Sequence, residues 1–273
     1  MTAIEHPHTL SMKAIAPQDA PFEIARSLEQ FTPHALSDLN NAKLMNRVDT
    51  KYLVHIQHLP ILLKSLTEAY TCLQIDGKLT SHYLNTYYDT AQLDFYHHHH
   101  QGRLNRFKVR HRLYADSQLG FLEVKHKNAQ SRTVKTRIES RSSDLHSKDI
   151  QTFIGSHGLS APQLDKTQLG QYDRIALANE KRGERITIDM NLAFSTVDSR
   201  TNITLPRVAI IEVKQQKIDR SSLLFKQVKS LGYRPLSFSK YCIGQSLLDP
   251  CLKANRFKPS IRYLHKLQTE IAQ

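Results

Sequence analysis

Basic side chains recur at every second position in three neighbouring segments of this chain, 104–113, 121–127 and 134–141. Because successive side chains of a β-strand point to opposite faces, each segment predicts a strand with one apolar and one cationic face. The first segment shows this most clearly, since Phe107 and Val109 lie opposite its cations. The basic residues that share the polar face are Arg106, Lys108, Arg110, Arg112, Lys125, Lys127, Lys135, Arg137 and Arg141.

The positive charge on this face predicts a polyanionic ligand. Residues 101–141 hold 11 Lys and Arg against three Asp and Glu, so cations on neighbouring strands would repel one another unless an anion bound between them. If the sheet closes into a barrel with its apolar face outward, the cations line a channel of lower effective dielectric than an open surface. Arginine would bind phosphate oxygens in a bidentate manner and lysine as a point charge. The alternative is an open antiparallel sheet with one solvated face. It can explain the alternation in any single strand, but it is a weaker explanation for charged faces on all six such candidate strands.

Carboxylates form a minority on the same face. Glu123 lies in the second segment, and two later candidate strands place Asp189 and Glu212 on their polar sides. Each carboxylate is either an ion-pair partner for the cations or an oxygen ligand for Mg²⁺ or Mn²⁺. Phosphoryl transfer normally uses such an ion, so we take Glu212 as the first candidate metal ligand, with Glu123 and Asp189 as further candidates.

The composition is consistent with a polyanion-binding protein. The 273 residues carry a net charge of +13 with a pI of about 9.6, which favours nucleic acid, an anionic membrane or a phosphorylated small molecule as partner. Nucleic acid is the weakest of these, because few aromatic residues lie among the basic strands and no RNP-like or helix-turn-helix signature is present.

The cysteines and the apolar runs indicate the compartment. Cys72, Cys242 and Cys251 form no CxxC pair, which argues against a disulfide framework or a zinc knuckle and for a reducing cytosol. The sequence contains neither a signal-peptide core nor a run of about 18 apolar residues, so we expect a cytoplasmic protein without a transmembrane segment of its own.

The periodicity predicts sheet and helices along most of the chain. Helical spacing of apolar residues predicts helices at 58–69 and 221–231, packed outside the sheet. His97–His100 are interpreted as a solvated turn, because four adjacent histidines cannot all face one metal ion without special backbone geometry. A period of two predicts strands at 44–55, 81–89, 104–115, 119–127, 132–141, 170–178, 184–198 and 206–216.

Eight short motifs, in order along residues 35–248, give the chain a family resemblance. Together they resemble the VTC domain of polyphosphate polymerases, a branch of the triphosphate tunnel metalloenzymes related to CYTH domains. CYTH enzymes typically begin with an ExExK strand, whereas Arg47 replaces the first carboxylate here, as in the VTC form. The motifs are LMNRVDTKYLV (44–54), TYYDT (86–90), RFKVRHRLY (106–114), FLEVKHK (121–127), YDR (172–174), RITID (185–189), IIEVK (210–214) and SFSKYC (237–242).

The resemblance implies an α+β fold, with a closed eight-stranded antiparallel β-barrel that forms a triphosphate tunnel and helices packed outside it. On this basis residues 31–250 are the tunnel domain. Prolines and mixed polarity without a period predict a flexible leader at residues 1–30, and residues 251–273 form a basic tail for which a helix from about Pro259 is expected. The tail is either a solvated helix or a contact for a membrane surface or a membrane-protein partner, and such a partner would make the protein membrane-associated.

The resemblance also implies the site residues. Ser239 and Lys240 depend on it alone, because their segment has no clear period. Glu212 would hold the metal. The residues expected to act on the phosphates are Lys51, Arg110, Arg112, Lys125, Lys135, Arg174, Arg185 and Lys240, and those expected to help bind the substrate are Tyr172, Lys214 and Ser239. The alternation of the strands adds Lys108, Lys127 and Arg137 as further substrate-binding residues.

The expected function is a metal-dependent polyphosphate polymerase that transfers the γ-phosphoryl group of ATP to a growing polyphosphate chain, with Mn²⁺ or Mg²⁺ as cofactor. The first alternative is a hydrolase of tripolyphosphate or nucleoside triphosphates on the same fold, with water as the acceptor. The second alternative is a non-catalytic polyphosphate-binding module.

Overall fold

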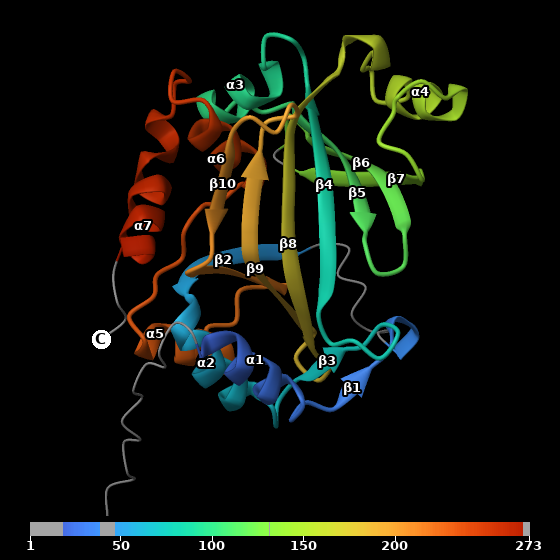
Figure 1. The fold of residues 1–273 in the computed structure, drawn as a ribbon. Coiled ribbons are helices and arrows are strands. Elements are labelled where there is room, and N and C mark those ends of the chain that lie inside the picture. Colours follow the sequence, from blue (N-terminus) through green and yellow to red (C-terminus); the bar gives the residue numbers. More distant parts are fainter. Residues whose placement is uncertain (1–18, 39–46, 131, 270–273) are drawn as a thin grey trace, which may run out of the picture.

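The computed structural model describes residues 19–38, 47–130 and 132–269, and Figure 1 shows the arrangement of their elements. One large antiparallel sheet dominates, with helices around it, so the α+β class is confirmed. The helices are α1 (Ala20–Leu28), α2 (Leu59–Leu66), α3 (Asp94–Gln101), α4 (Lys148–Gly155), α5 (Leu223–Ser230), α6 (Lys240–Leu248) and α7 (Lys258–Thr269), with short 3₁₀ turns η1 (Leu36–Asp38), η2 (Ile56–His58), η3 (Ala161–Gln163) and η4 (Asn255–Phe257).

Eight strands form a continuous antiparallel path in the order β2-β11-β9-β8-β4-β5-β6-β7. Each corresponds to one of the eight strands predicted from the period of two, although β8 is longer than expected. Short strands β1 (Pro33–His34), β3 (Thr71–Leu73) and β10 (Asn202–Leu205) extend the sheet at its margins. The eight are β2 (Val48–His55), β4 (Ser81–Asp89), β5 (Arg106–Tyr114), β6 (Leu119–Lys127), β7 (Thr133–Glu139), β8 (Asp165–Asn179), β9 (Glu184–Ser195) and β11 (Val208–Gln215).

The alternation of side chains separates an apolar face from a charged one. On β9 and β11, Ile186, Ile188, Ile211 and Val213 are almost completely buried, and they belong to the main hydrophobic core. Burying a side chain of this size contributes roughly 1.5–3 kcal/mol relative to leaving it exposed. The residues between them therefore face the other side of the sheet, where the charges are.

Helices cover the two ends of the sheet. In Figure 1, α3 and α6 lie near one end, and α1, α2 and α5 gather near the other. Helix α7 packs on β2 and β11, with Leu264 and Leu267 buried, so the predicted basic C-terminal segment contains a helix that is docked on the sheet. None of the helices in the described ranges is long and apolar enough to cross a membrane.

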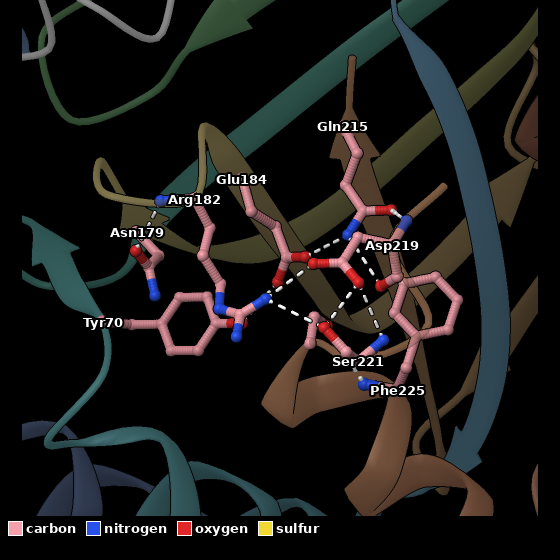
Figure 2. Close-up of polar contacts among 9 residues, drawn as sticks. Tyr70, Asn179, Arg182, Glu184, Gln215, Asp219, Ser221 and Phe225 are labelled. Carbon is pink, nitrogen blue, oxygen red and sulfur yellow. Dashed lines mark hydrogen bonds and ion pairs between the residues drawn. The ribbon is translucent and has the colours of Figure 1, made fainter. Parts of the chain in front are cut away.

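A buried polar network holds the ends of β9 and β11 together (Figure 2). Glu184 is fully buried and accepts hydrogen bonds from the Tyr70 hydroxyl and the side-chain amide of Gln215. The side-chain oxygen Oε1 of Gln215 accepts from the backbone N–H of Asp219 at 3.0 Å. Arg182 pairs with Asp219 at 2.6 Å. Because Glu184 and Gln215 directly adjoin charged residues of the opposite face, the network fixes the strand ends that carry those charges.

Three expectations differ from the structure. Residues 20–28 of the expected flexible leader form α1, whose Ile24 and Leu28 are buried, whereas residues 1–18 lie outside the described part. His97–His100 form the end of α3 and not a solvated turn, with His99 partly buried. Helix α6 was missed because it is buried on nearly all sides, and such a helix has no amphipathic period.

Candidate functional site

A cavity of about 240 Å³ lies on the charged face of the sheet. Both ends of the strand path contribute to its wall, Lys51 from β2 and Lys135 from β7, so the sheet curls around it. In the described residues, no backbone pairing joins β2 to β7. The wall consists of Arg47, Asp49, Lys51, Tyr87, Lys108, Arg110, Arg112, Glu123, Lys125, Lys135, Tyr172, Arg174, Ile210, Glu212, Lys214, Phe238, Ser239, Lys240 and Tyr241.

The wall carries a large excess of positive charge. Ten of these residues are Lys or Arg, and three are Asp or Glu, so the cavity suits an anion. Burial lowers the pKa of Lys108, Lys135 and Lys214 to about 8, and neighbouring cations act in the same direction. The charged form of these three lysines is therefore less favourable in the free cavity than in water, and an anion bound in the cavity would stabilise it.

Glu123 compensates part of this charge inside the wall. Its carboxylate is 2% exposed, and it pairs with Arg110 at 2.6 Å and with Lys135 through its other oxygen. Burial raises its pKa, but the charges of Arg110, Arg112 and Lys135 outweigh that effect and hold the pKa well below the usual range. Both oxygens are thus engaged, so Glu123 is an ion-pair partner in this arrangement.

Asp189 has the same role behind the wall. It accepts two hydrogen bonds from Arg174, at 2.5 and 2.8 Å, and its Oδ2 also accepts from Lys240. Burial acts against the ionised form, yet Arg174 and Lys240 hold the pKa of Asp189 well below its ordinary value. Its carboxylate is 2% exposed and does not line the cavity, so it orients two cations toward the space that the cavity offers.

Glu212 differs from these two carboxylates. Its Oε1 lies 3.3 Å from Lys51 Nζ and 4.0 Å from Lys214 Nζ, and its side chain is 19% exposed. Despite burial, the charges of Lys214 and Lys51 lower its pKa well below the ordinary value, so it is ionised. Of the three candidate metal ligands it is the least engaged and the most accessible from the cavity.

The carboxylates of the site fit a metal ion that is held partly by the protein and partly by a bound phosphate compound. No group of three or more His, Cys, Asp or Glu side chains forms a complete metal site within the described residues. Mg²⁺ is typically bound by one or two carboxylates together with substrate phosphates and waters, so Glu212 alone meets the requirement on the protein side. Glu123 and Asp189 would each have to give up two cation partners first.

Aromatic rings hold several of the cations in place. The Tyr172 hydroxyl accepts a hydrogen bond from Arg112 at 2.7 Å, and Lys240 Nζ lies 4.4 Å from the centre of the Tyr172 ring. Tyr83 stacks on Tyr172 at 5.3 Å, and the guanidinium of Arg174 lies 5.1 Å from the centre of the Tyr83 ring. Because each cation is held on two sides, little side-chain freedom is lost when an anion binds.

The N-terminus of α6 closes one part of the wall. Ser239 caps this helix by accepting a hydrogen bond from the backbone N–H of Cys242 at 3.3 Å, and its hydroxyl also accepts from Lys108 Nζ at 2.8 Å. Lys240 follows directly and reaches Asp189. The structure thus brings Ser239 and Lys240 to the cavity, although no periodicity predicted them.

Four of the candidate site residues do not line the cavity: Asp189, Arg185, Lys127 and Arg137. Arg185 pairs in register with Lys214 at the end of β9, and the charge of Arg47 helps to lower its pKa after burial. Lys127 lies two residues beyond Lys125 on β6. Arg137 is exposed and stacks over the Phe121 ring at 4.3 Å.

Some wall residues were not predicted as site residues. Arg47 and Asp49 share the parity of Lys51 on β2, so the period of two already indicated them. Asp49 pairs with Arg47 at 3.1 Å, which places a second carboxylate on the same wall as Glu212. Tyr87 and Tyr241 had no such signal, because an aromatic residue in a strand or helix is normally assigned to the core.

Comparison with known proteins gives one family match and several structures of similar fold. A family model for the VTC domain matches residues 46–249. A candidate adenylyl cyclase from Hippeastrum, described as having a dominant triphosphatase activity, has a TM-score of 0.50 at 16% identity, covering 75% of this chain and 97% of its own. A candidate adenylate cyclase from Bacillus halodurans has a TM-score of 0.47 at 12% identity, covering 71% of this chain and 94% of its own. No curated protein sequence matches the chain.

Proposed function

This chain belongs to the VTC domain family, and we propose that it is a metal-dependent polyphosphate polymerase that transfers the γ-phosphoryl group of ATP to a polyphosphate chain held in the cavity. The observation that carries the proposal is the wall itself, with ten cations against three carboxylates around one cavity. A compact metabolite with one carboxylate or phosphate would leave most of these cations without a counterion. A chain of phosphates would pair with them along its length.

The cations act on the transferred group through position and charge. Arg110, Arg112 and Arg174 are fixed by Glu123, Tyr172 and Asp189, so their guanidinium groups are oriented before the substrate arrives. Charge that develops on the transferring phosphoryl group would be stabilised by these preorganised donors, and the terminal phosphate of the acceptor chain would attack in line. No covalent protein nucleophile is required.

Glu212 is the proposed metal ligand. Glu212 would hold Mg²⁺ or Mn²⁺, and the ion would supply positive charge that neutralises the phosphates. Lys51 and Lys214 flank the carboxylate and would contact the same phosphates. This assignment leaves Glu123 and Asp189 as fixed counterions for the wall cations.

We also propose that the curled sheet acts as a closed tunnel, with the gap between β2 and β7 bridged by contacts to the phosphate chain. The two strands face the same cavity through Lys51 and Lys135. Arg185 and Arg137, which lie off the wall, would then contact substrate near an opening of the tunnel.

The test of the activity is a product analysis. Purified protein is incubated with ATP and Mn²⁺ or Mg²⁺, with and without a short polyphosphate primer, and the products are resolved by chain length together with ADP and orthophosphate. Metal-dependent chains with a matching amount of ADP are the expected result. Polyphosphate binding without any turnover would contradict the proposal and favour a non-catalytic binding module.

A triphosphate hydrolase is the second candidate function. The fold similarity to the Hippeastrum protein, which is described as having a dominant triphosphatase activity, favours it. In that reaction water replaces the phosphate chain as acceptor, and the same cations would stabilise the transferring group. Orthophosphate released from ATP or tripolyphosphate, without chains at any primer concentration, would move the assignment to this activity.

Binding of tripolyphosphate should be accompanied by proton uptake near pH 8. The pKa of Lys108, Lys135 and Lys214 is lowered to about 8, so each is partly deprotonated in the free cavity at that pH. A bound polyanion favours the charged ammonium and raises these pKa values, so protons are taken up, and affinity falls between about pH 7 and about pH 9. Calorimetry in two buffers of different ionisation enthalpy measures the uptake.

A matched pair of lysine variants controls this prediction. Lys214→Met should reduce the uptake, whereas Lys229→Met, at an exposed position of α5, should leave it unchanged. Affinity that is constant over this pH range, with a heat of binding independent of the buffer, would show that the wall lysines are already fully charged in the free protein.

A further inference from the structure

The row of cations continues beyond the cavity at one end of β5 and β6. Arg106 lies two residues before Lys108, and Lys127 two residues after Lys125. Arg106 pairs in register with Lys127, as Lys108 does with Lys125. All four side chains therefore share one face of the sheet, and Arg106 and Lys127 extend it past the last residues of the wall.

A third cation joins this extension from the C-terminal part of the chain. Arg256 lies in η4, outside the residues that match the VTC family model. Its guanidinium packs against the backbone of Gly102 so closely that a Cβ there would lie 2.2 Å from Nη1. Gly102 also has a φ of +72°, a left-handed backbone conformation that favours glycine at this position. The neighbouring Phe257 is buried against Tyr96, which anchors η4 at this place.

These cations have no carboxylate partner. In the part of the chain that the structure describes, no ion pair includes Arg106, Lys127 or Arg256, and the Arg106 side chain donates only to the backbone carbonyl of Arg103. The charge of Arg256 contributes, after burial, to lowering the pKa of Arg106. The cavity wall, in contrast, contains Asp49, Glu123 and Glu212, and Asp189 behind it pairs with two of the wall cations.

The neutral side chain of His99 lies among them. Burial and the positive charges of Lys108, Arg106 and Arg256 lower the pKa of His99 to about 2, so it adds no further charge. Its Nδ1 is buried and has no hydrogen-bond partner in the described residues. Positive charge without a counterion is what a site for an external anion would contain.

We propose that Arg106, Lys127 and Arg256 form an outer subsite that binds the part of an inorganic polyphosphate chain extending from the cavity. The proposal rests on the proposed binding of phosphate chains in the cavity, and it adds the direction in which a growing chain leaves the cavity. Glu212, the proposed metal ligand, lies within the cavity, whereas the outer subsite holds cations alone. A growing chain would thus leave the cavity past α3 and η4. Triphosphate, held in the cavity, would not need the outer subsite.

The test compares ligands of two lengths. Dissociation constants for tripolyphosphate and for a long polyphosphate are measured for the full chain and for Arg256→Gln and Arg106→Gln. Each variant should weaken binding of the long chain on the order of 10-fold and leave tripolyphosphate within about twofold, since a charge-assisted contact is lost only for the longer ligand. Arg262→Gln, an exposed α7 cation with the same change in net charge, should affect neither ligand, and Arg256→Lys should restore part of the long-chain affinity.

The outcomes separate this proposal from the proposed function. If the unchanged protein binds both ligands but Arg256→Gln and Arg106→Gln bind the long chain normally, the outer subsite is wrong and the cavity assignment stands. Equal weakening for both ligands would also overturn the subsite, since tripolyphosphate should not reach it. Failure of the unchanged protein to bind either ligand would overturn both proposals. A single-stranded RNA that competes for the long-chain site with the same dependence on Arg256 would overturn the assignment to polyphosphate.

Discussion

Glu212→Gln should abolish metal-dependent turnover while the protein still binds phosphate chains. The substitution keeps the size of the side chain but removes the most accessible and most loosely paired of the three candidate metal ligands. Since a bound metal supplies several kcal/mol of charge stabilisation, kcat should fall on the order of 10²- to 10³-fold. Metal-free affinity for tripolyphosphate should be equal or higher, because the wall loses one negative charge. Steady-state kinetics and calorimetry measure the two quantities.

The control for this prediction is Glu68→Gln, at an exposed position after α2, which should change neither quantity. Metal titration of the tripolyphosphate complex gives a readout that does not depend on activity, since the variant should need far more Mn²⁺ to reach saturation. Full activity in Glu212→Gln, with an unchanged metal titration, would remove Glu212 from the metal site. Loss of both turnover and metal-free binding would show that the substitution had damaged the cavity.

Asp189→Asn should destabilise the free protein strongly, and tripolyphosphate should recover much of the loss. Asp189 is 2% exposed and is the shared counterion of Arg174 and Lys240. Removing one partner of a buried ion pair costs about 3–5 kcal/mol, because the remaining charges stay buried without compensation. A bound polyanion supplies negative charge to the same two cations, so the ligand-induced increase in unfolding free energy should be larger in the variant than in the unchanged protein.

Denaturant unfolding with and without tripolyphosphate measures both effects. The matched control is Asp198→Asn, in an exposed ion pair with Arg200, which should have little effect on stability. If Asp189→Asn unfolds at the same denaturant concentration as the unchanged protein, Asp189 does not compensate the buried cations. If it is destabilised but gains no more from tripolyphosphate than the unchanged protein does, the anion does not bind beside Arg174 and Lys240.

Most of the cavity wall could be predicted from the sequence because the period of two is a local property. Once 104–113 is a strand, the backbone alone places Lys108, Arg110 and Arg112 on one face, and the same holds for Lys125 and Lys135 on their strands. The register of β5, β6 and β7 then stacks Lys108, Lys125 and Lys135 side by side. Neighbouring strands connected by short turns leave few other pairings.

Residues contributed by other elements could not be predicted in this way. Ser239 and Lys240 reach the cavity from the start of α6, whose sequence has no period because it is buried on nearly all sides. Arg256 reaches the outer subsite because η4 packs against the end of α3, a contact between segments more than 150 residues apart. No local pattern records such a contact.

The sequence by itself determined which side chains share the charged face, since the alternation of a strand depends only on the direction of successive Cα–Cβ bonds. Only the tertiary structure decided what each charge does there. The three carboxylates Glu123, Asp189 and Glu212 all lie on the charged face of their strands. Cations at hydrogen-bond distance occupy both oxygens of the first two, whereas the cations nearest to Glu212 are 3.3 and 4.0 Å away. That difference depends on the separations between strands and helices, and electrostatic energies vary steeply with distance and burial.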